Sequence, residues 1–244
     1  MAVIKPFRIK SFKKPKPMVS LKNISLSFGK RKILDNISFN INQNEILGIL
    51  GPNGTGKSTI FNIITGLIKP DYGSVKFNSV EAVNIPVYLR TKNFNIGFVP
   101  QHGGYFSDLT TIDNLRSIAE IVVSDKKLID RKIKYLVAKF ELDAVVDIYA
   151  KFLSGGQKKK LVIAMALLGD PKILLLDECF AALDVLTIKM LQEIIVNLQY
   201  ENNITICICD HQARDLLSCV DKAIVLSNTK IISQGTPSYL VNDP

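Results

Sequence analysis

The sequence predicts an α/β protein with a largely parallel sheet that is covered by helices. Short, fully apolar runs, as at 46–50 and 173–176, alternate with segments that have helical periodicity. Strands separated by helices form parallel sheets, because a parallel connection must cross the sheet. One stretch, at about 102–152, has helical periodicity and no strand pattern. We therefore expect a helical insertion in an α/β domain, and the 47% hydrophobic content of the 244 residues is enough for a large core.

The pattern of the first hundred residues predicts several strands and one helix. From position 19 onward, apolar residues alternate with polar ones, as in strands with one buried face. The run at 46–50 leads directly into a glycine-rich loop and a helix, and 70–73 is a turn sequence. The expected elements are strands at 19–21, 24–28, 37–41, 46–50, 74–77 and 96–99 and a helix at 57–66.

The remainder predicts the helical insertion and then a return to alternating strands and helices. Thr110 or Thr111 can cap a helix that extends to 124, and 127–140 is a second amphipathic helix. The expected elements after Ser154 are helices to 168, at 186–200 and at 212–220, and strands at 172–176, 205–209, 223–226 and 231–233.

The net charge of +9 is concentrated at the N-terminus. Residues 1–17 contain six basic residues, three prolines and no acidic residue, so we treat them as a basic tail that precedes one domain at 18–244. A flexible tail is the first interpretation. An arm that binds anionic lipid or an acidic partner is the second. Nucleic acid is the third, because no aromatic platform accompanies the charges.

The cysteine spacing and the hydropathy argue against a cysteine-based metal site, a membrane-spanning segment and a secretory signal. No C-x-x-C pair is present, and Cys207 and Cys209 should face one side of a strand, so a metal site would need two further ligands. We expect all four cysteines to be reduced, buried thiols. No apolar stretch approaches the ~18 residues of a membrane span, and the N-terminus has no secretory h-region. A link to a membrane would therefore come through a partner.

A phosphate-binding loop follows the strand at 46–50. Its residues are Gly51, Pro52, Asn53, Gly54, Thr55, Gly56, Lys57, Ser58 and Thr59, which fit G-x-x-x-x-G-K-[ST]. The glycines allow successive backbone N–H groups to converge on phosphate oxygens, and the helix that follows adds its positive end. Lys57 can reach the β- and γ-phosphates, and the Ser58 hydroxyl can bind Mg²⁺. The loop therefore predicts that a nucleotide is bound.

Two carboxylates, Asp177 and Glu178, follow the strand at 172–176. They stand at its carboxyl end, where ligands of open α/β sheets bind. Asp177 can hold Mg²⁺ through water, and Glu178 can orient and deprotonate the water that attacks a phosphate. A lone acidic pair at a strand end is usually a solvated turn or a helix cap, but the phosphate-binding loop upstream favours the catalytic alternative.

Ser154, Gly155, Gly156 and Gln157 begin a predicted helix and form a second candidate anion site. One nucleotide does not need two such sites from one chain. We therefore expect this site to serve a second molecule, although a plain helix N-cap explains the same residues equally well.

Four further residues follow predicted strands or stand beside them. Gln101 can sense Mg²⁺ and water, and His211 can contact a γ-phosphate. Asp184 stands six residues beyond Glu178, in a loop that could cross a dimer interface. Phe28 could stack on adenine, although an aromatic residue in an early strand is otherwise simply part of the core.

In combination and in order, these motifs resemble the ATP-binding subunit of ABC transporters. The residues that carry the resemblance are Phe28, 51–59, Gln101, 153–157, 174–178, Asp184 and His211. The resemblance covers about 19–240 and implies a RecA-like P-loop NTPase core with an antiparallel β subdomain and a helical subdomain inserted at about 102–155. It also implies a head-to-tail homodimer with ATP held between each phosphate loop and the opposite Ser154–Gln157 run.

Within the family, 178–184, 209–216 and 101–115 resemble the branch that drives lipopolysaccharide export. This implies transmembrane permease subunits of the LptF and LptG type as partners, at the cytoplasmic face of the inner membrane. ATPases of branched-chain amino-acid importers remain the alternative. A soluble ABC protein acting on ribosomes or DNA is a further alternative, but such proteins usually carry two ATPase domains or a long coiled coil, so no direct nucleic-acid partner is expected.

Overall fold

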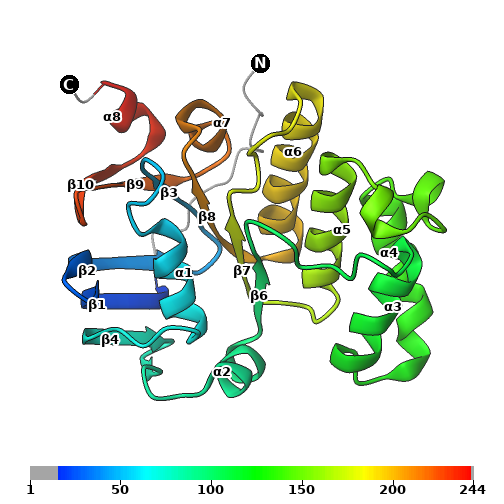
Figure 1. Cartoon of the computed structure of the whole chain (residues 1–244), viewed down its shortest axis with the longest axis horizontal. Helices are drawn as coiled ribbons and strands as arrows, with labels where there is room; N and C mark the ends of the chain where they lie inside the picture. Colours follow the sequence, from blue (N-terminus) through cyan, green and yellow to red (C-terminus); the bar gives the residue numbers. More distant parts are fainter. Residues whose placement is uncertain (1–15, 243–244) are drawn as a thin grey trace.

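A six-stranded sheet forms the centre of the protein in the computed structural model, which describes residues 16–242 (Figure 1). The strand order is β10-β9-β3-β8-β7-β6, and all neighbours are parallel except β10 and β9. The strands are β3 (Ile46–Leu50), β6 (Ile96–Val99), β7 (Ile173–Asp177), β8 (Thr205–Asp210), β9 (Lys222–Ser227) and β10 (Lys230–Gly235). The predicted α/β class with a largely parallel sheet is confirmed.

A second, antiparallel sheet packs beside the first, with the order β2-β1-β4-β5. Its strands are β1 (Pro17–Phe28), β2 (Arg31–Asn42), β4 (Tyr72–Phe77) and β5 (Val80–Glu81). The two runs predicted at 19–21 and 24–28 are one strand, in which the register to β2 shifts between Leu21 and Ile24. Asn23 has a left-handed φ of 53° at this shift, which interrupts the apolar alternation and explains why the sequence suggested two strands.

Eight α-helices connect or flank the strands within the described residues. They are α1 (Lys57–Thr65), α2 (Val87–Phe94), α3 (Thr111–Val122), α4 (Ile129–Lys139), α5 (Gly155–Leu167), α6 (Val185–Asn202), α7 (Ala213–Leu217) and α8 (Pro237–Asn242). The sequence did not predict α2, α8 or β5. The helix expected at 212–220 is reduced to α7, and the start of the helix expected at 127–140 is a 3-10 turn.

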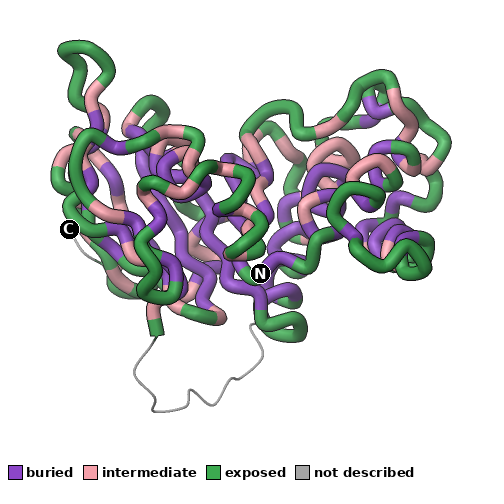
Figure 2. Tube along the Cα trace, turned by 90° about the horizontal axis from the view of Figure 1, so that it is seen from below, coloured by how far each residue is buried: buried purple, intermediate pink, exposed green. Residues whose placement is uncertain are grey.

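The sheet separates two hydrophobic clusters, and alternate residues of each strand enter one or the other. Ile206 and Ile208 contribute to the cluster that contains α5 and α6. Cys207 and Cys209 contribute to the cluster that contains α1 and the antiparallel sheet. The prediction that these cysteines share a face is confirmed, and all four cysteines are free and buried. Helices therefore cover both faces of the sheet: α5 and α6 cover one, and α1 covers the other together with the antiparallel sheet. Figure 2 shows the buried residues gathered in these strands and helices.

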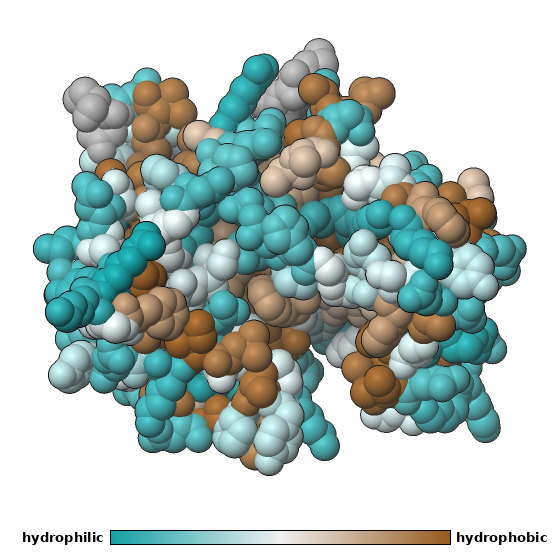
Figure 3. Space-filling model, viewed as in Figure 1, coloured by the Kyte–Doolittle hydropathy of each residue, from teal (hydrophilic) through white to brown (hydrophobic). Residues whose placement is uncertain are grey.

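Residues 102–155 hold α3 and α4 and, within the described chain, no strand of either sheet. Thr110 caps α3, as predicted, by accepting a hydrogen bond from the Asp113 backbone. In Figure 1 these helices form a lobe at one side of the molecule, and in Figure 3 an indentation separates this lobe from the part that contains α2.

The carboxyl ends of the parallel strands lie at one edge of the sheet, which positions the loops that follow β3, β6, β7 and β8 next to one another. Residues 1–15, which hold most of the predicted basic tail, lie outside the described residues, and Pro17 already belongs to β1. Between residues 16 and 242, no helix has the length and hydrophobicity that crossing a bilayer requires.

Candidate functional site

The loop between β3 and α1 has the backbone that its glycines allow. Gly54 and Gly56 have φ values of 80° and 99°, in the left-handed region that side chains other than glycine rarely adopt. A Cβ atom at Gly56 would lie 2.8 Å from the Leu34 side chain, and one at Gly51 would lie 2.4 Å from the Leu226 carbonyl. The loop is therefore held tightly between β2 and β9, with α1 beginning at Lys57.

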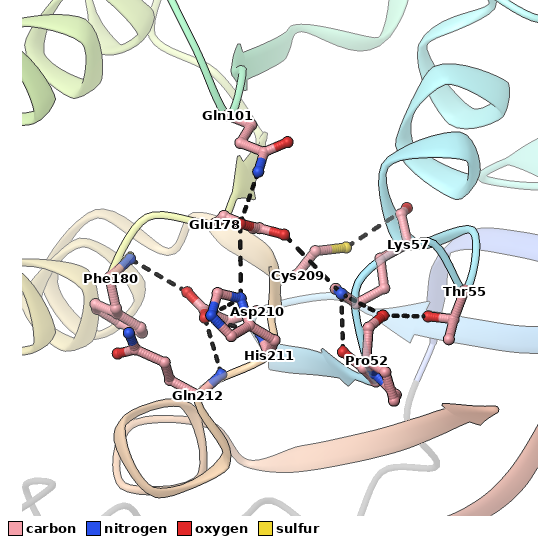
Figure 4. Close-up of polar contacts among 11 residues, drawn as sticks. Pro52, Thr55, Lys57, Gln101, Glu178, Phe180, Cys209, Asp210, His211 and Gln212 are labelled. Atoms are coloured by element: carbon pink, nitrogen blue, oxygen red, sulfur yellow. Dashed lines mark hydrogen bonds and ion pairs between the residues drawn. The ribbon is translucent and has the colours of Figure 1, made fainter. Parts of the chain in front are cut away.

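Lys57 lies inside this loop and is almost fully buried. Its ammonium group donates hydrogen bonds to the carbonyl oxygens of Gly51 (2.8 Å) and Pro52 (3.0 Å), as Figure 4 shows. The Thr55 hydroxyl also donates to the Pro52 carbonyl, at 2.9 Å. These bonds fix a positive charge at the centre of a ring of backbone groups, where an anion can be bound.

Glu178 is the meeting point of the predicted catalytic residues. The amide nitrogen of Gln101 donates to Glu178 Oε2 at 2.7 Å, and His211 Nδ1 lies 3.6 Å from the same oxygen (Figure 4). The Lys57 ammonium lies 4.0 Å from Glu178 Oε1. The carboxylate is therefore shared among groups that follow β6 and β8 and a group at the start of α1.

The backbone of Glu178 is strained. Its φ is +45°, a conformation that costs a residue other than glycine about 1–3 kcal/mol. The backbone N–H donates to the Cys209 carbonyl at 2.8 Å, which continues the β7–β8 ladder past the end of β7. This bond holds the turn in place, and the turn directs a buried carboxylate toward Lys57 instead of into solvent.

Asp177 is the last residue of β7 and is buried. Burial raises the pKa of its carboxyl group, while a hydrogen bond from Ser58 opposes that shift. Its Oδ1 atom is buried and has no hydrogen-bond partner among residues 16–242. Mg²⁺ prefers hard oxygen ligands, and a carboxylate oxygen without a hydrogen-bond partner beside a serine hydroxyl offers two of them. Asp177 and Ser58 could therefore hold the ion, and Gln101, the third predicted ligand, lines the same pocket as Ser58.

A pocket of about 330 Å³ opens in front of these groups. The β1–β2 hairpin contributes Phe28, Arg31 and Ile33 to its wall, and Phe28 is half exposed at the end of β1. The other lining residues are Asn53, Gly54, Gly56, Lys57, Ser58, Thr59, Gln101 and Glu178. The wall from the hairpin therefore carries an aromatic ring and a guanidinium group, and the opposite wall carries the phosphate loop. A nucleotide has a base and a phosphate chain that suit these two walls.

Ser154, Gly155, Gly156 and Gln157 do not line this pocket. They begin α5 with a capping box, in which the Ser154 hydroxyl accepts from the Gln157 N–H and the Gln157 side chain accepts from the Ser154 N–H. The run is solvent-accessible, so the backbone at the start of α5 faces outward.

Asp184 lies near the Ser154–Gln157 run and does not line the phosphate pocket. It caps α6 by accepting bonds from the backbone N–H groups of Leu186 and Thr187, and the Thr187 hydroxyl bond lowers its pKa. A Cβ atom at Gly156 would lie 3.0 Å from the Thr187 side chain. The starts of α5 and α6 are therefore adjacent, and both are separate from the Lys57 loop.

Sequence reasoning missed Asp210, which ends β8 as Asp177 ends β7. It is fully buried and accepts hydrogen bonds from the backbone N–H groups of Phe180, His211 and Gln212. It therefore fixes the turns that carry both Glu178 and His211. The usable signal was its position at the carboxyl end of an apolar strand. Arg31 was also missed, although it follows Phe28 by only three positions.

Comparisons with known proteins show the family of the chain. The family model of ABC transporters matches residues 34–181. The chain is 33% identical over 230 residues to the lipopolysaccharide export system ATP-binding protein LptB of Haemophilus influenzae, which covers 93% of both chains. It is 36% identical over 231 residues to the sulfate/thiosulfate import ATP-binding protein CysA of Pectobacterium atrosepticum, which covers 93% of this chain and 68% of that protein.

A solved structure has the same fold. It is the dimeric post-hydrolysis state of the ATP-binding cassette MJ0796 bound to ADP and Pi. It superposes with a TM-score of 0.82 at 27% identity, and the match covers 90% of this chain and 99% of that chain.

Proposed function

The chain belongs to the ABC transporter family as an ATP-hydrolysing subunit, and from this premise we propose that it powers lipopolysaccharide export from the inner membrane. The proposed site of ATP hydrolysis rests on one observation. Lys57, Gln101 and His211 all lie around the Glu178 carboxylate. A nucleotide in the adjoining pocket would present its γ-phosphate to these groups.

In the proposed mechanism, the loop of Gly51–Thr59 holds the phosphates and Phe28 stacks on the adenine. Glu178 accepts a proton from the attacking water, and Gln101 keeps that water in line with the γ-phosphate. His211 contacts the γ-phosphate from the end of β8. Magnesium, held by Ser58, Asp177 and Gln101, would neutralise charge on the phosphate oxygens. Catalysis is then mainly positioning and charge neutralisation.

We further propose that two copies of the chain complete each other's site. Ser154, Gly155, Gly156 and Gln157 are accessible at the start of α5, where backbone N–H groups can bind an anion. Because this run does not line its own chain's pocket, it is free to close over the ATP of a second copy. Asp184, at the adjacent start of α6, would lie in the same interface. The dimeric MJ0796 cassette supports such an arrangement.

The proposed membrane partners are a pair of permease subunits of the LptF and LptG type, with this chain at the cytoplasmic face of the inner membrane. The LptB relatives support this assignment, because they match along nearly their full length. The surface near Gln101 and Tyr105, with half-exposed Phe106, is the proposed contact with the permease.

An importer ATPase is the second candidate, and the 36% identity to a sulfate/thiosulfate import protein favours keeping it. A branched-chain amino-acid importer remains within this class. A role on ribosomes or DNA has no comparable support.

Purification of the chain from its native membranes, with Glu178→Gln to stabilise the ATP-bound state, would test the proposal. We expect two related permease subunits to co-purify, together with lipopolysaccharide. Recovery of a solute-importer permease would replace the export assignment with the importer one. Recovery of ribosomes or DNA without any membrane protein would overturn the transport function.

A further inference from the structure

Arg31 occupies a position that the proposed function leaves without a role. It begins β2 and is the Cα partner of Phe28 across the tight turn of the β1–β2 hairpin. Gly29 in this turn has a φ of +58°, which glycine adopts without strain and which tight hairpin turns require. The hairpin therefore places Arg31 opposite Phe28, and both residues line the pocket in front of the phosphate loop.

The alternation of side chains along β2 sends Arg31 toward the phosphate pocket. Arg31 and Ile33 both line that pocket, whereas Lys32, between them, faces away and pairs with Asp35 at 3.1 Å. Within the described part of the chain, the Arg31 side chain forms no hydrogen bond or ion pair. An always-charged side chain without a partner, at the edge of an anion-binding pocket, has its donors free for a ligand.

The geometry limits which part of a nucleotide this side chain can reach. The Ile33 side chain and carbonyl lie 3.2 Å and 3.3 Å from the position of a Cβ atom at Gly56, so β2 runs along the phosphate loop at that point. Arg31 is two residues back toward Phe28, about 7 Å along the strand. Its flexible stem can cover that distance, which brings the guanidinium between the loop that holds the β- and γ-phosphates and the ring that holds the base.

We propose that Arg31 binds the α-phosphate of the nucleotide. The proposal rests on the ATP-binding function and adds to it the residue that recognises the part common to nucleoside di- and triphosphates. A guanidinium offers two parallel N–H donors to phosphate oxygens, a pairing that is stronger than a neutral hydrogen bond. The contact does not depend on the γ-phosphate, so it retains ADP as strongly as it retains ATP, and it does not depend on the base.

The test compares the wild-type chain with Arg31→Ala, Arg31→Lys and Lys32→Ala, each titrated with fluorescent N-methylanthraniloyl derivatives of ATP, ADP and GTP. Lys32 is the matched control, because it carries the same charge one position along the strand and faces away. We expect Arg31→Ala to weaken binding of all three nucleotides by roughly tenfold, as the loss of one charge-assisted hydrogen bond would. Arg31→Lys should recover part of the loss, and Lys32→Ala should bind as the wild type does.

Four outcomes would decide the matter. Equal affinity of Arg31→Ala and the wild type, with an unchanged thermal unfolding curve, would overturn the proposal and leave the ATP-binding function intact. A loss confined to ATP would move the contact to the γ-phosphate, and a loss that differs between ATP and GTP would move it to the base, so either result would overturn the α-phosphate assignment. A wild-type chain that binds none of the nucleotides would contradict the proposed function itself.

Discussion

Gln101 donates a 2.7 Å hydrogen bond from its amide to the Oε2 atom of Glu178, so the second residue after β6 holds the carboxylate that follows β7. The bond joins two positions 77 residues apart. It is made to a buried carboxylate whose other neighbours are Lys57 and His211, at 4.0 Å and 3.6 Å. The hydrogen bond therefore couples the position of Gln101 to that of the proposed catalytic base.

Replacement of Gln101 tests this link. Gln101→Ala removes a donor that orients Glu178, so we expect kcat for ATP hydrolysis to fall by at least tenfold with little change in KM. Gln101→Glu should be worse, because two carboxylates would face each other in a buried site. Steady-state ATPase assays would measure both. Full activity in the alanine variant would mean that Glu178 is positioned without this bond.

Glu178→Gln is expected to separate binding from hydrolysis. The amide keeps the size of the side chain, and its carbonyl oxygen can still accept the hydrogen bond from Gln101, but it cannot take a proton from water. We predict wild-type ATP affinity, a loss of turnover of at least a hundredfold and a stable dimer in the presence of ATP. Nucleotide titration, phosphate release and gel filtration would measure the three quantities. Hydrolysis at the wild-type rate would remove Glu178 from the role of base.

Asp177→Asn should stabilise the protein in the absence of metal while abolishing magnesium-dependent hydrolysis. Burial raises the pKa of Asp177 above its ordinary 3.8, so between 3.8 and the folded-state value the folded protein binds more protons than the unfolded chain. Stability from this group is therefore present at low pH and lost as pH rises through the folded-state pKa. At pH 7 the variant should melt about 2–4 °C higher, equivalent to about 1 kcal/mol.

The control for that experiment is Asp147→Asn, which removes an exposed carboxylate and should leave the melting temperature unchanged. Magnesium should raise the melting temperature of the nucleotide-bound wild type but not that of Asp177→Asn. A variant that melts lower than the wild type without magnesium would contradict the view that Asp177 carries an uncompensated buried charge.

Arg90 on α2 is predicted to be a major determinant of stability. It is almost fully buried, and its guanidinium donates to the carbonyl oxygens of Ile63 (2.7 Å) and Ile64 (3.0 Å) at the end of α1. Arg90→Met leaves these carbonyls without a partner, so we expect a loss of about 3 kcal/mol and a melting temperature lower by roughly 6–12 °C. Lys92→Met, exposed on the same helix, is the control. Equal melting of both variants would show that other groups satisfy the end of α1.

Arg90 also explains why α2 was missing from the sequence prediction. A helix is recognised from apolar residues on its buried face, but Arg90 is the buried residue of α2, whereas Tyr88 and Leu89 are exposed. The period of hydrophobic residues therefore carries no signal there. The central strands were predictable for the opposite reason, since each residue of Ile46–Leu50 is buried and apolar.

The site residues that stand in motifs at strand ends could be predicted from the sequence. Residues whose roles depend on contacts formed only in the folded protein could not. Lys57 and Glu178 stand in or beside recognisable motifs at strand ends, so their meeting followed from the parallel sheet. Asp210 accepts hydrogen bonds from the backbone N–H groups of Phe180, His211 and Gln212, and its position at the end of an apolar strand is the one sign of this role in the sequence. Arg31 depends on the turn at Gly29 that folds it back beside Phe28.

The central claim is that each ATP is held by Lys57 of one copy and closed in by Ser154 of the other. Ser154→Asp suits a test of this claim, because aspartate also caps helices and keeps α5 intact, while its charge repels a γ-phosphate. Ser154→Asn, which caps without charge, is the control. Lys57→Ala is the complementary lesion in the phosphate loop. Both would be placed in the Glu178→Gln background, so that bound ATP is retained.

The decisive measurement is the amount of ATP retained when the Lys57→Ala and Ser154→Asp chains are mixed. Each variant alone has two damaged sites and should retain none. A mixed dimer has one site with both lesions and one with neither, so we predict retention of about one ATP per mixed dimer. If the mixture retained no more ATP than the separate variants, the two residues would serve the same chain's nucleotide, and the shared-site account would be wrong.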